Sequence, residues 1–80
     1  MKNNERFDKE FQAFLLSVGE KIKSMREKKG ITQENMENSQ FGSIEYKFYQ
    51  RIEYGEKNIT LKTLFKICKK LGISPKDLFK

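Results

Sequence analysis

Three places in the chain carry the same local signal for the start of a helix. Each has an isoleucine, then a hydroxyl residue, then an apolar residue four positions further on: Ile31-Thr32 with Met36, Ile59-Thr60 with Leu64, and Ile73-Ser74 with Leu78. A hydroxyl at this position accepts a hydrogen bond from the first helical turn. The two apolar side chains pack across that turn and fix how the chain enters the helix. Pro75 and Asp77 add residues that are favoured in the first turn of the last helix.

Apolar residues before the first of these starts recur three or four positions apart. They mark one helical face: Phe7, Phe11, Phe14, Leu15, Val18, Ile22 and Met25. We expect one long amphipathic helix that runs to Lys29 and ends at Gly30. Gly19 is where it could bend, because glycine stabilises a helix about 1 kcal/mol less than alanine does. Ser17 and Glu20 also form a capping box, so two shorter helices are the alternative.

The two later starts predict the remaining helices of the second half. One spans about Leu61 to Leu71 and ends at Gly72. Its apolar register predicts five buried residues: Leu61, Leu64, Phe65, Cys68 and Leu71. The other runs from Pro75 to about Phe79. With a helix from Thr32 and another at about residues 45–54, the expected fold is an all-α, five-helix bundle. Because 80 residues enclose only one core, residues 1–80 should form a single domain.

The helix at about residues 45–54, called the reading helix below, combines aromatic, cationic and amide side chains. Tyr49 and Ile52 are three positions apart and can both face the core. Four residues then remain mostly on the outside, and together they are called the reading face: Tyr46, Lys47, Gln50 and Arg51. Such a face suits a polyanion that also displays hydrogen-bonding edges. The sequence therefore predicts a helix-turn-helix that places this helix in the major groove of double-stranded DNA.

Each side chain of the reading face can contact a particular group on DNA. Lys47 and Arg51 lie one turn apart and can reach guanine O6 and N7 or phosphate oxygens. Tyr46 can touch a thymine methyl group or a phosphate, and Gln50 can pair with adenine or a phosphate. Phe48 either stacks on sugar and methyl groups or packs inward, and we favour packing.

Residues on both sides of the reading helix suit the DNA backbone. Gln33 lies in the first turn of the preceding helix, whose free amides point the same way, and can donate to a phosphate. Gly55 can take the left-handed conformation that ends the reading helix. Lys57 and Asn58 in the loop that follows are then placed for phosphate contacts.

The net positive charge agrees with an anionic partner, but the segment that contains the reading helix does not supply this charge. The chain carries a formal net charge of +6 with a pI near 9.5. Residues 1–17 are neutral and residues 31–61 carry −2, whereas residues 18–30 carry +3 and residues 62–80 carry +5. Long-range attraction to DNA must therefore come from the helices that flank the reading helix.

The single cysteine and the absence of histidine argue against catalysis and metal binding. Cys68 has no partner for an internal disulfide and falls in an apolar helical register, which indicates a core residue. We expect no enzyme activity, no cofactor, no metal and no small-molecule ligand. No segment approaches the ~18 apolar residues of a membrane span, and the N-terminus does not resemble a signal peptide. We therefore expect a cytoplasmic protein that does not associate with membranes.

The order of these features resembles the phage-repressor-like helix-turn-helix family, also called the Xre or Cro/C1-type family. Two segments carry the similarity, which covers about Val18 to Phe79: VGEKIKSMREKKGITQENM and RIEYGEKNITLKTLFKICKKLGISPKDLF. The resemblance implies a homodimeric DNA-binding transcription regulator, a repressor or a controller, that recognises a near-palindromic operator. It assigns Gln33 to a phosphate and Tyr46, Lys47 and Arg51 to bases. It also implies a structural ion pair between Arg26 and Glu53 that joins the first helix to the reading helix.

The chain departs from the family pattern in two regions. Between Gln33 and Ile52 it is about two residues longer, and Glu37 and Phe41 replace small or apolar residues. The reading helix could consequently be capped at Ser43 or begin near Glu45. Residues 1–17 lie outside the match, and their Phe-rich face could serve packing or dimerisation.

Two further alternatives remain open from the sequence. The surface around Leu78 and Phe79 competes with the Phe7 and Phe11 face as the dimer interface. The same fold could also serve as a protein-interaction or antitoxin-like module.

Overall fold

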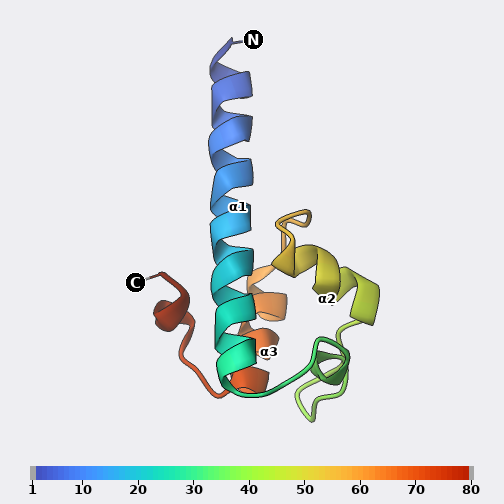
Figure 1. Ribbon diagram of the computed structural model, residues 1–80. Coiled ribbons are helices and arrows are strands. Elements are labelled where there is room, and N and C mark those ends of the chain that lie inside the picture. Colours follow the sequence, from blue (N-terminus) through green and yellow to red (C-terminus); the bar gives the residue numbers. More distant parts are fainter. Residues whose placement is uncertain (1, 80) are drawn as a thin grey trace.

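The computed structural model describes residues 2–79 and contains, within that range, helical elements and no strand (Figure 1). The elements are α1 (Lys2–Lys28), the 3₁₀ segment η1 (Glu34–Met36), α2 (Tyr46–Glu53), α3 (Leu61–Leu71) and the 3₁₀ segment η2 (Pro75–Phe79). The expectation of one long N-terminal helix is confirmed, and the alternative of two shorter helices is wrong. Figure 1 shows α2 and α3 gathered around the C-terminal half of α1, while its N-terminal half projects beyond them.

The prediction of five helices is not confirmed, because the segment from Thr32 forms a single 3₁₀ turn. Thr32 does act as a cap, since its hydroxyl accepts a hydrogen bond from the Asn35 amide at 3.2 Å. Met36 is fully buried, but a continued helix would next place Ser39 and Gln40 on the buried face. Those polar side chains cannot extend the apolar stripe, so the chain leaves the helix after one turn.

The boundaries of α3 agree with the sequence, and Leu64, Cys68 and Leu71 are buried as predicted, but the buried face is rotated by a small part of a turn. Thr60 caps the helix by accepting a hydrogen bond from the Thr63 amide, and Gly72 ends it. Leu61 and Phe65, predicted to be buried, are 83% and 54% exposed. The buried stripe instead has four members: Leu64, Ile67, Cys68 and Leu71.

The core joins α1, η1, α2, α3 and η2 into one cluster. Its buried apolar residues are Val18, Ile22, Met36, Ile44, Tyr49, Ile52, Leu64, Ile67, Cys68, Leu71 and Leu78. The isoleucines of the three predicted helix starts, Ile31, Ile59 and Ile73, pack against this cluster. Leu78 therefore belongs to the core and not to an exposed surface.

Two glycines let α1 and the C-terminal end of α2 approach each other closely. A Cβ atom on Gly19 would lie 2.5 Å from the carbonyl oxygens of both Ile52 and Glu53. Gly55 has a φ of +74°, and a Cβ there would lie 2.7 Å from the Leu16 Cα atom. Neither contact tolerates a side chain, so both glycines are required where the end of α2 packs on α1.

Candidate nucleic-acid interface

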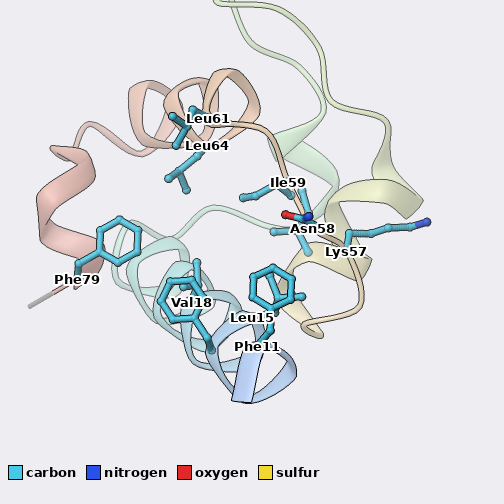
Figure 2. Close-up of a pocket in the computed structure, with 11 residues that line it drawn as sticks. Phe11, Leu15, Val18, Lys57, Asn58, Ile59, Leu61, Leu64 and Phe79 are labelled. Atoms are coloured by element: carbon cyan, nitrogen blue, oxygen red, sulfur yellow. The ribbon is translucent and has the colours of Figure 1, made fainter. Parts of the chain in front are cut away.

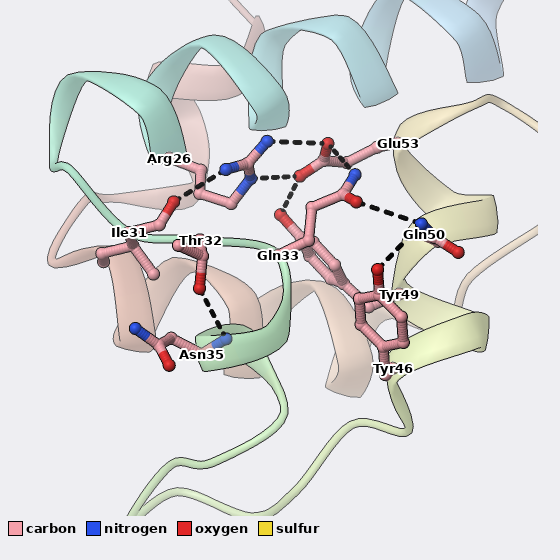
Figure 3. A network of polar contacts seen from close by, with 9 residues as sticks. All are labelled: Arg26, Ile31, Thr32, Gln33, Asn35, Tyr46, Tyr49, Gln50 and Glu53. Carbon is pink, nitrogen blue, oxygen red and sulfur yellow. Dashed lines mark hydrogen bonds and ion pairs between the residues drawn. The ribbon is translucent and has the colours of Figure 1, made fainter.

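A buried ion pair joins the end of α1 to the end of α2. Arg26 Nε lies 2.7 Å from Glu53 Oε2 and Arg26 Nη2 lies 3.3 Å from Glu53 Oε1 (Figure 3). The two residues are only 8% and 3% exposed. Arg26 Nη1 also donates to the Ile31 carbonyl at 2.7 Å, which holds the turn after α1. This pair fixes the position of α2 relative to the body of the protein.

Glu53 accepts further hydrogen bonds from two other residues. Gln33 Nε2 donates to Glu53 Oε1 at 2.9 Å, and the Tyr49 hydroxyl donates to Glu53 Oε2. Burial alone would raise the pKa of Glu53, but the hydrogen bonds from Arg26, Tyr49 and Gln33 outweigh it and hold this pKa below its ordinary value. Burial, together with the bond to Glu53, raises the pKa of the Tyr49 hydroxyl, so Tyr49 remains a donor.

The network continues from this buried carboxylate to the outer face of α2. Gln50 Nε2 donates to Gln33 Oε1 at 3.2 Å and to the Tyr46 hydroxyl at 3.1 Å. Figure 3 shows the resulting path from Arg26 through Glu53 and Gln33 to Gln50 and Tyr46. The outermost side chains of this path belong to the predicted reading face.

Two carboxylates cap the N-terminus of α2. Glu45 accepts hydrogen bonds from the Lys47 amide at 2.9 Å and the Phe48 amide at 3.1 Å. Glu37 accepts one from the Tyr46 amide at 2.8 Å, across nine residues of chain. The helix thus begins after Glu45, and the alternative of a Ser43 cap is wrong. One sequence signal pointed to the role of Glu37, because this residue departs from the small or apolar residues of the family pattern.

The residues of α2 are buried or exposed as their spacing predicts. Tyr49 and Ile52 are buried, and Phe48 packs against the core, which was the favoured alternative. Lys47 and Arg51 are exposed one turn apart, and Tyr46 and Gln50 are partly exposed. The four reading-face residues therefore lie together on the solvent side of one short helix.

Two lysines of α3 contact the connection between η1 and α2, which is longer than in the family pattern. Lys70 Nζ donates to the Asn38 carbonyl at 2.7 Å. Lys69 Nζ lies 5.8 Å from the centre of the Phe41 ring and 5.6 Å from that of Phe65. These cation–π contacts and the hydrogen bond tie the extra residues of this connection to the body.

The residues predicted to contact phosphates lie at the start of η1 and in the loop after α2. Gln33 uses one amide hydrogen for Glu53, which leaves the second N–H available to a ligand. Lys57 and Asn58 occupy the loop after α2. The Lys57 stem lines an apolar pocket, while its ammonium group points away from that pocket (Figure 2).

The described residues offer little to other kinds of chemistry. Among residues 2–79, no group of three histidine, cysteine, aspartate or glutamate side chains could hold a metal ion. Burial raises the pKa of the Cys68 thiol, which lies in the core. No helix within the same range is long and apolar enough to span a membrane.

A long helix, a capped 3₁₀ turn and a short exposed helix held by a buried ion pair are arranged as in a helix-turn-helix protein. The profile of the helix-turn-helix domain family matches residues 19–80, and the chain belongs to that family. By class it is a DNA-binding transcriptional regulator of the type that the resemblance to Xre and Cro/C1 proteins predicted.

A solved structure agrees with this assignment. The crystal structure of the restriction-modification controller protein C.AhdI from Aeromonas hydrophila matches with a TM-score of 0.76 and 27% sequence identity. The match covers 84% of this chain and 98% of that one. A comparison with curated protein sequences finds no match. The first 18 residues, which carry three of the phenylalanines of α1, lie outside the family profile.

Proposed function

We propose that residues 1–80 act as one DNA-binding domain that recognises a near-palindromic site as a homodimer, with α2 in the major groove of each half-site. The observation that carries this proposal is the reading face, which is exposed on α2 while the opposite side of α2 is anchored through Glu53 to α1. A rigidly held helix presents its side chains in one arrangement, which sequence-specific recognition requires. The twofold axis would set two copies of α2 ~34 Å apart, one turn of DNA.

The proposed regulator works in the cytoplasm and catalyses no reaction. Its likeness to a restriction-modification controller protein supports a function as a controller. A simple repressor would use the same contacts with DNA. Its concentration would set how much of the operator is occupied. Lys47 and Arg51 would contact bases, with Gln33, Lys57 and Asn58 on phosphates.

Replacing Arg51 by alanine should relax base preference at one position of each half-site. Arg51 is exposed on α2 and can reach guanine, so its loss should cost ~1–3 kcal/mol per base contact. The measurement is affinity for the cognate duplex and for a panel of duplexes with single base changes. A uniform loss across that panel would instead place Arg51 on the backbone.

Two comparison variants define the behaviour of a phosphate contact. Lys57→Ala should weaken binding to all duplexes alike and lower the slope of log K against log salt by ~0.9, the value for one neutralised phosphate. Asn58→Ala should also weaken binding to every sequence, but without a change in that slope, because an amide side chain neutralises no phosphate charge.

A module that only contacts proteins would behave differently in the same titrations. It would show neither a preferred duplex nor the salt dependence that phosphate contacts produce. Salt titration of the wild-type protein on its selected duplex therefore separates the two functions.

The two surfaces that the sequence left in competition as a dimer interface lie next to each other. Phe7, Phe11 and Phe14 of α1 stack in succession, with ring centres 6.3 and 6.4 Å apart, and Phe14 stacks on Phe79 of η2 at 6.3 Å. Phe7 and Phe79 are 66% and 53% exposed. We call these four rings the aromatic ladder. Phe11, Phe14 and Phe79 of the ladder also line the neighbouring apolar pocket, so the ladder and the pocket adjoin.

A second copy of this chain is the occupant that fits the ladder best. The exposed rings continue along the projecting part of α1, so a small ligand in the pocket would leave Phe7 in water. By helical geometry Glu10 lies beside the stripe of rings, where it pairs with Arg6 at 4.0 Å, and Asp8 lies about a quarter turn from the stripe on its other side. Leu61 and Phe79 are exposed at the border of the same pocket, so a second copy would cover them together with the rings of α1.

Phe7→Ser should therefore dissociate the dimer while leaving the monomer folded, because Phe7 lies outside the core. Losing one buried aromatic ring from each of two symmetric contacts should weaken dimerisation by ~100-fold or more. Sedimentation over a range of protein concentrations measures this change. Phe65→Ser, which removes an exposed ring elsewhere, should leave the dimer intact. A wild-type protein that remains monomeric at high micromolar concentration contradicts the proposed dimer.

A further inference from the structure

The donor and acceptor of each hydrogen bond between the core and the reading face can be assigned in only one way. Glu53 is held in its ionised form and can only accept, so Gln33 must present its NH₂ group to Glu53 Oε1. The carbonyl oxygen of the same amide then faces Gln50, which must present its own NH₂ group in return. The buried ion pair therefore determines the amide orientation of a partly exposed residue.

This orientation decides what Gln50 and Tyr46 can offer to a ligand. The Gln50 nitrogen carries two hydrogens, and its two partners are Gln33 Oε1 at 3.2 Å and the Tyr46 hydroxyl at 3.1 Å. The Gln50 carbonyl oxygen is left as an acceptor. The Tyr46 oxygen accepts from Gln50, so the hydroxyl hydrogen can be donated elsewhere. A donor and an acceptor thus stand side by side on the outer face of α2.

Of the four bases, only adenine complements this pair in the major groove. Adenine presents the N7 acceptor beside the N6 amino donor. Guanine presents two acceptors, thymine an acceptor and a methyl group, and cytosine a donor alone. An arrangement fixed as one donor and one acceptor consequently distinguishes adenine from guanine, although both bases carry N7.

We propose that Tyr46 and Gln50 jointly read one adenine in each half-site, with the Tyr46 hydroxyl donating to N7 and the Gln50 carbonyl accepting from the N6 amino group. The inference rests on the proposed function, because it requires α2 to lie in the major groove. Gln33 is then a positioning residue, since it fixes the orientation of Gln50 through its bond to Glu53.

Base analogues test the two hydrogen bonds separately. Selection from random duplexes first yields the half-site, which should contain an adenine whose change to guanine weakens binding. In one half-site, 7-deazaadenine removes the N7 acceptor and purine removes the N6 amino group. Each analogue should weaken wild-type binding about 3- to 10-fold, the effect of one hydrogen bond. A selected half-site without such an adenine overturns the inference, while sequence-specific binding itself would still support the proposed function.

Variants assign each hydrogen bond to its residue. Tyr46→Phe should be insensitive to 7-deazaadenine and remain sensitive to purine, and Gln50→Met should show the reverse. Lys47→Ala, on the same face, should bind more weakly but keep both sensitivities. A Tyr46→Phe protein that still discriminates against 7-deazaadenine overturns the assignment of N7 to Tyr46.

The positioning role of Gln33 has its own readout. Gln33→Leu frees the Gln50 amide to turn over and donate to guanine, so the ratio of adenine to guanine affinity should fall about 3- to 10-fold. Loss of a phosphate contact would lower both affinities equally and leave that ratio unchanged. An unchanged ratio therefore overturns the positioning role.

Discussion

Replacing Glu53 by glutamine is expected to lower the free energy of unfolding by ~3–5 kcal/mol, because it leaves the buried Arg26 guanidinium without a counter-charge. The loss is large for a domain of 80 residues, whose total stability is of a similar order. Glutamine also replaces one acceptor oxygen by an NH₂ group, so the bonds from Arg26, Tyr49 and Gln33 cannot all be kept. Urea unfolding followed by circular dichroism measures this change.

Glu56→Gln is the matched control, since Glu56 is exposed and follows α2 by three residues. Its effect should stay within about 0.5 kcal/mol, as for most surface substitutions. Small, equal effects of the two variants would show that the ion pair contributes little.

The same carboxylate predicts how stability depends on pH. The pKa of Glu53 in the folded protein lies below its ordinary value of 4.5. Its contribution is therefore fully present above that ordinary value and is lost as the pH falls toward the folded pKa. Wild-type protein should lose more stability on acidification in this range than Glu53→Gln does. Parallel pH profiles for the two proteins would contradict this assignment.

Replacing Gly19 by alanine should destabilise the protein, although alanine is the better helix former by about 1 kcal/mol. The added Cβ would lie 2.5 Å from two backbone carbonyl oxygens of α2, and backbone atoms cannot move aside as a flexible side chain can. Overpacking of this kind costs ~1–3 kcal/mol, so the change in stability should have the opposite sign to that of helix propensity. The melting temperature should fall accordingly.

Ser17→Ala provides the control, because Ser17 is exposed on the same stretch of α1. That variant should be neutral or slightly more stable, as propensity predicts. If Gly19→Ala also raised the melting temperature, the close approach of α1 and α2 would be wrong.

The sequence alone determined the local features of this fold. The long α1, both boundaries of α3 and the caps at Thr32 and Thr60 followed from signals that act within about one helical turn. The division of α2 into a buried and an exposed side also followed from spacing. Such features depend on residues three or four positions apart, which a sequence displays directly.

Tertiary packing decided the length of η1 and the exposure of individual residues. The segment after Thr32 stops after one turn, where Ser39 and Gln40 cannot extend the buried stripe and the side chain of Glu37 caps α2. Leu61 and Phe65 fit an apolar register but lie on the side of α3 that no other element covers. Which side of a helix is covered depends on the arrangement of its neighbours, and periodicity specifies that only to within part of a turn.

The orientation of the reading face was likewise decided by tertiary structure. Its hydrogen bonds join residues far apart in the chain: Arg26 with Glu53 across 27 positions, Gln33 with Glu53 across 20, and Gln33 with Gln50 across 17. The sequence contained each of these residues, and the family resemblance paired Arg26 with Glu53. That Gln33 would connect this pair to Gln50 and Tyr46 became visible only in the packed structure. The reason is that a hydrogen bond between separate elements depends on where packing places both of them.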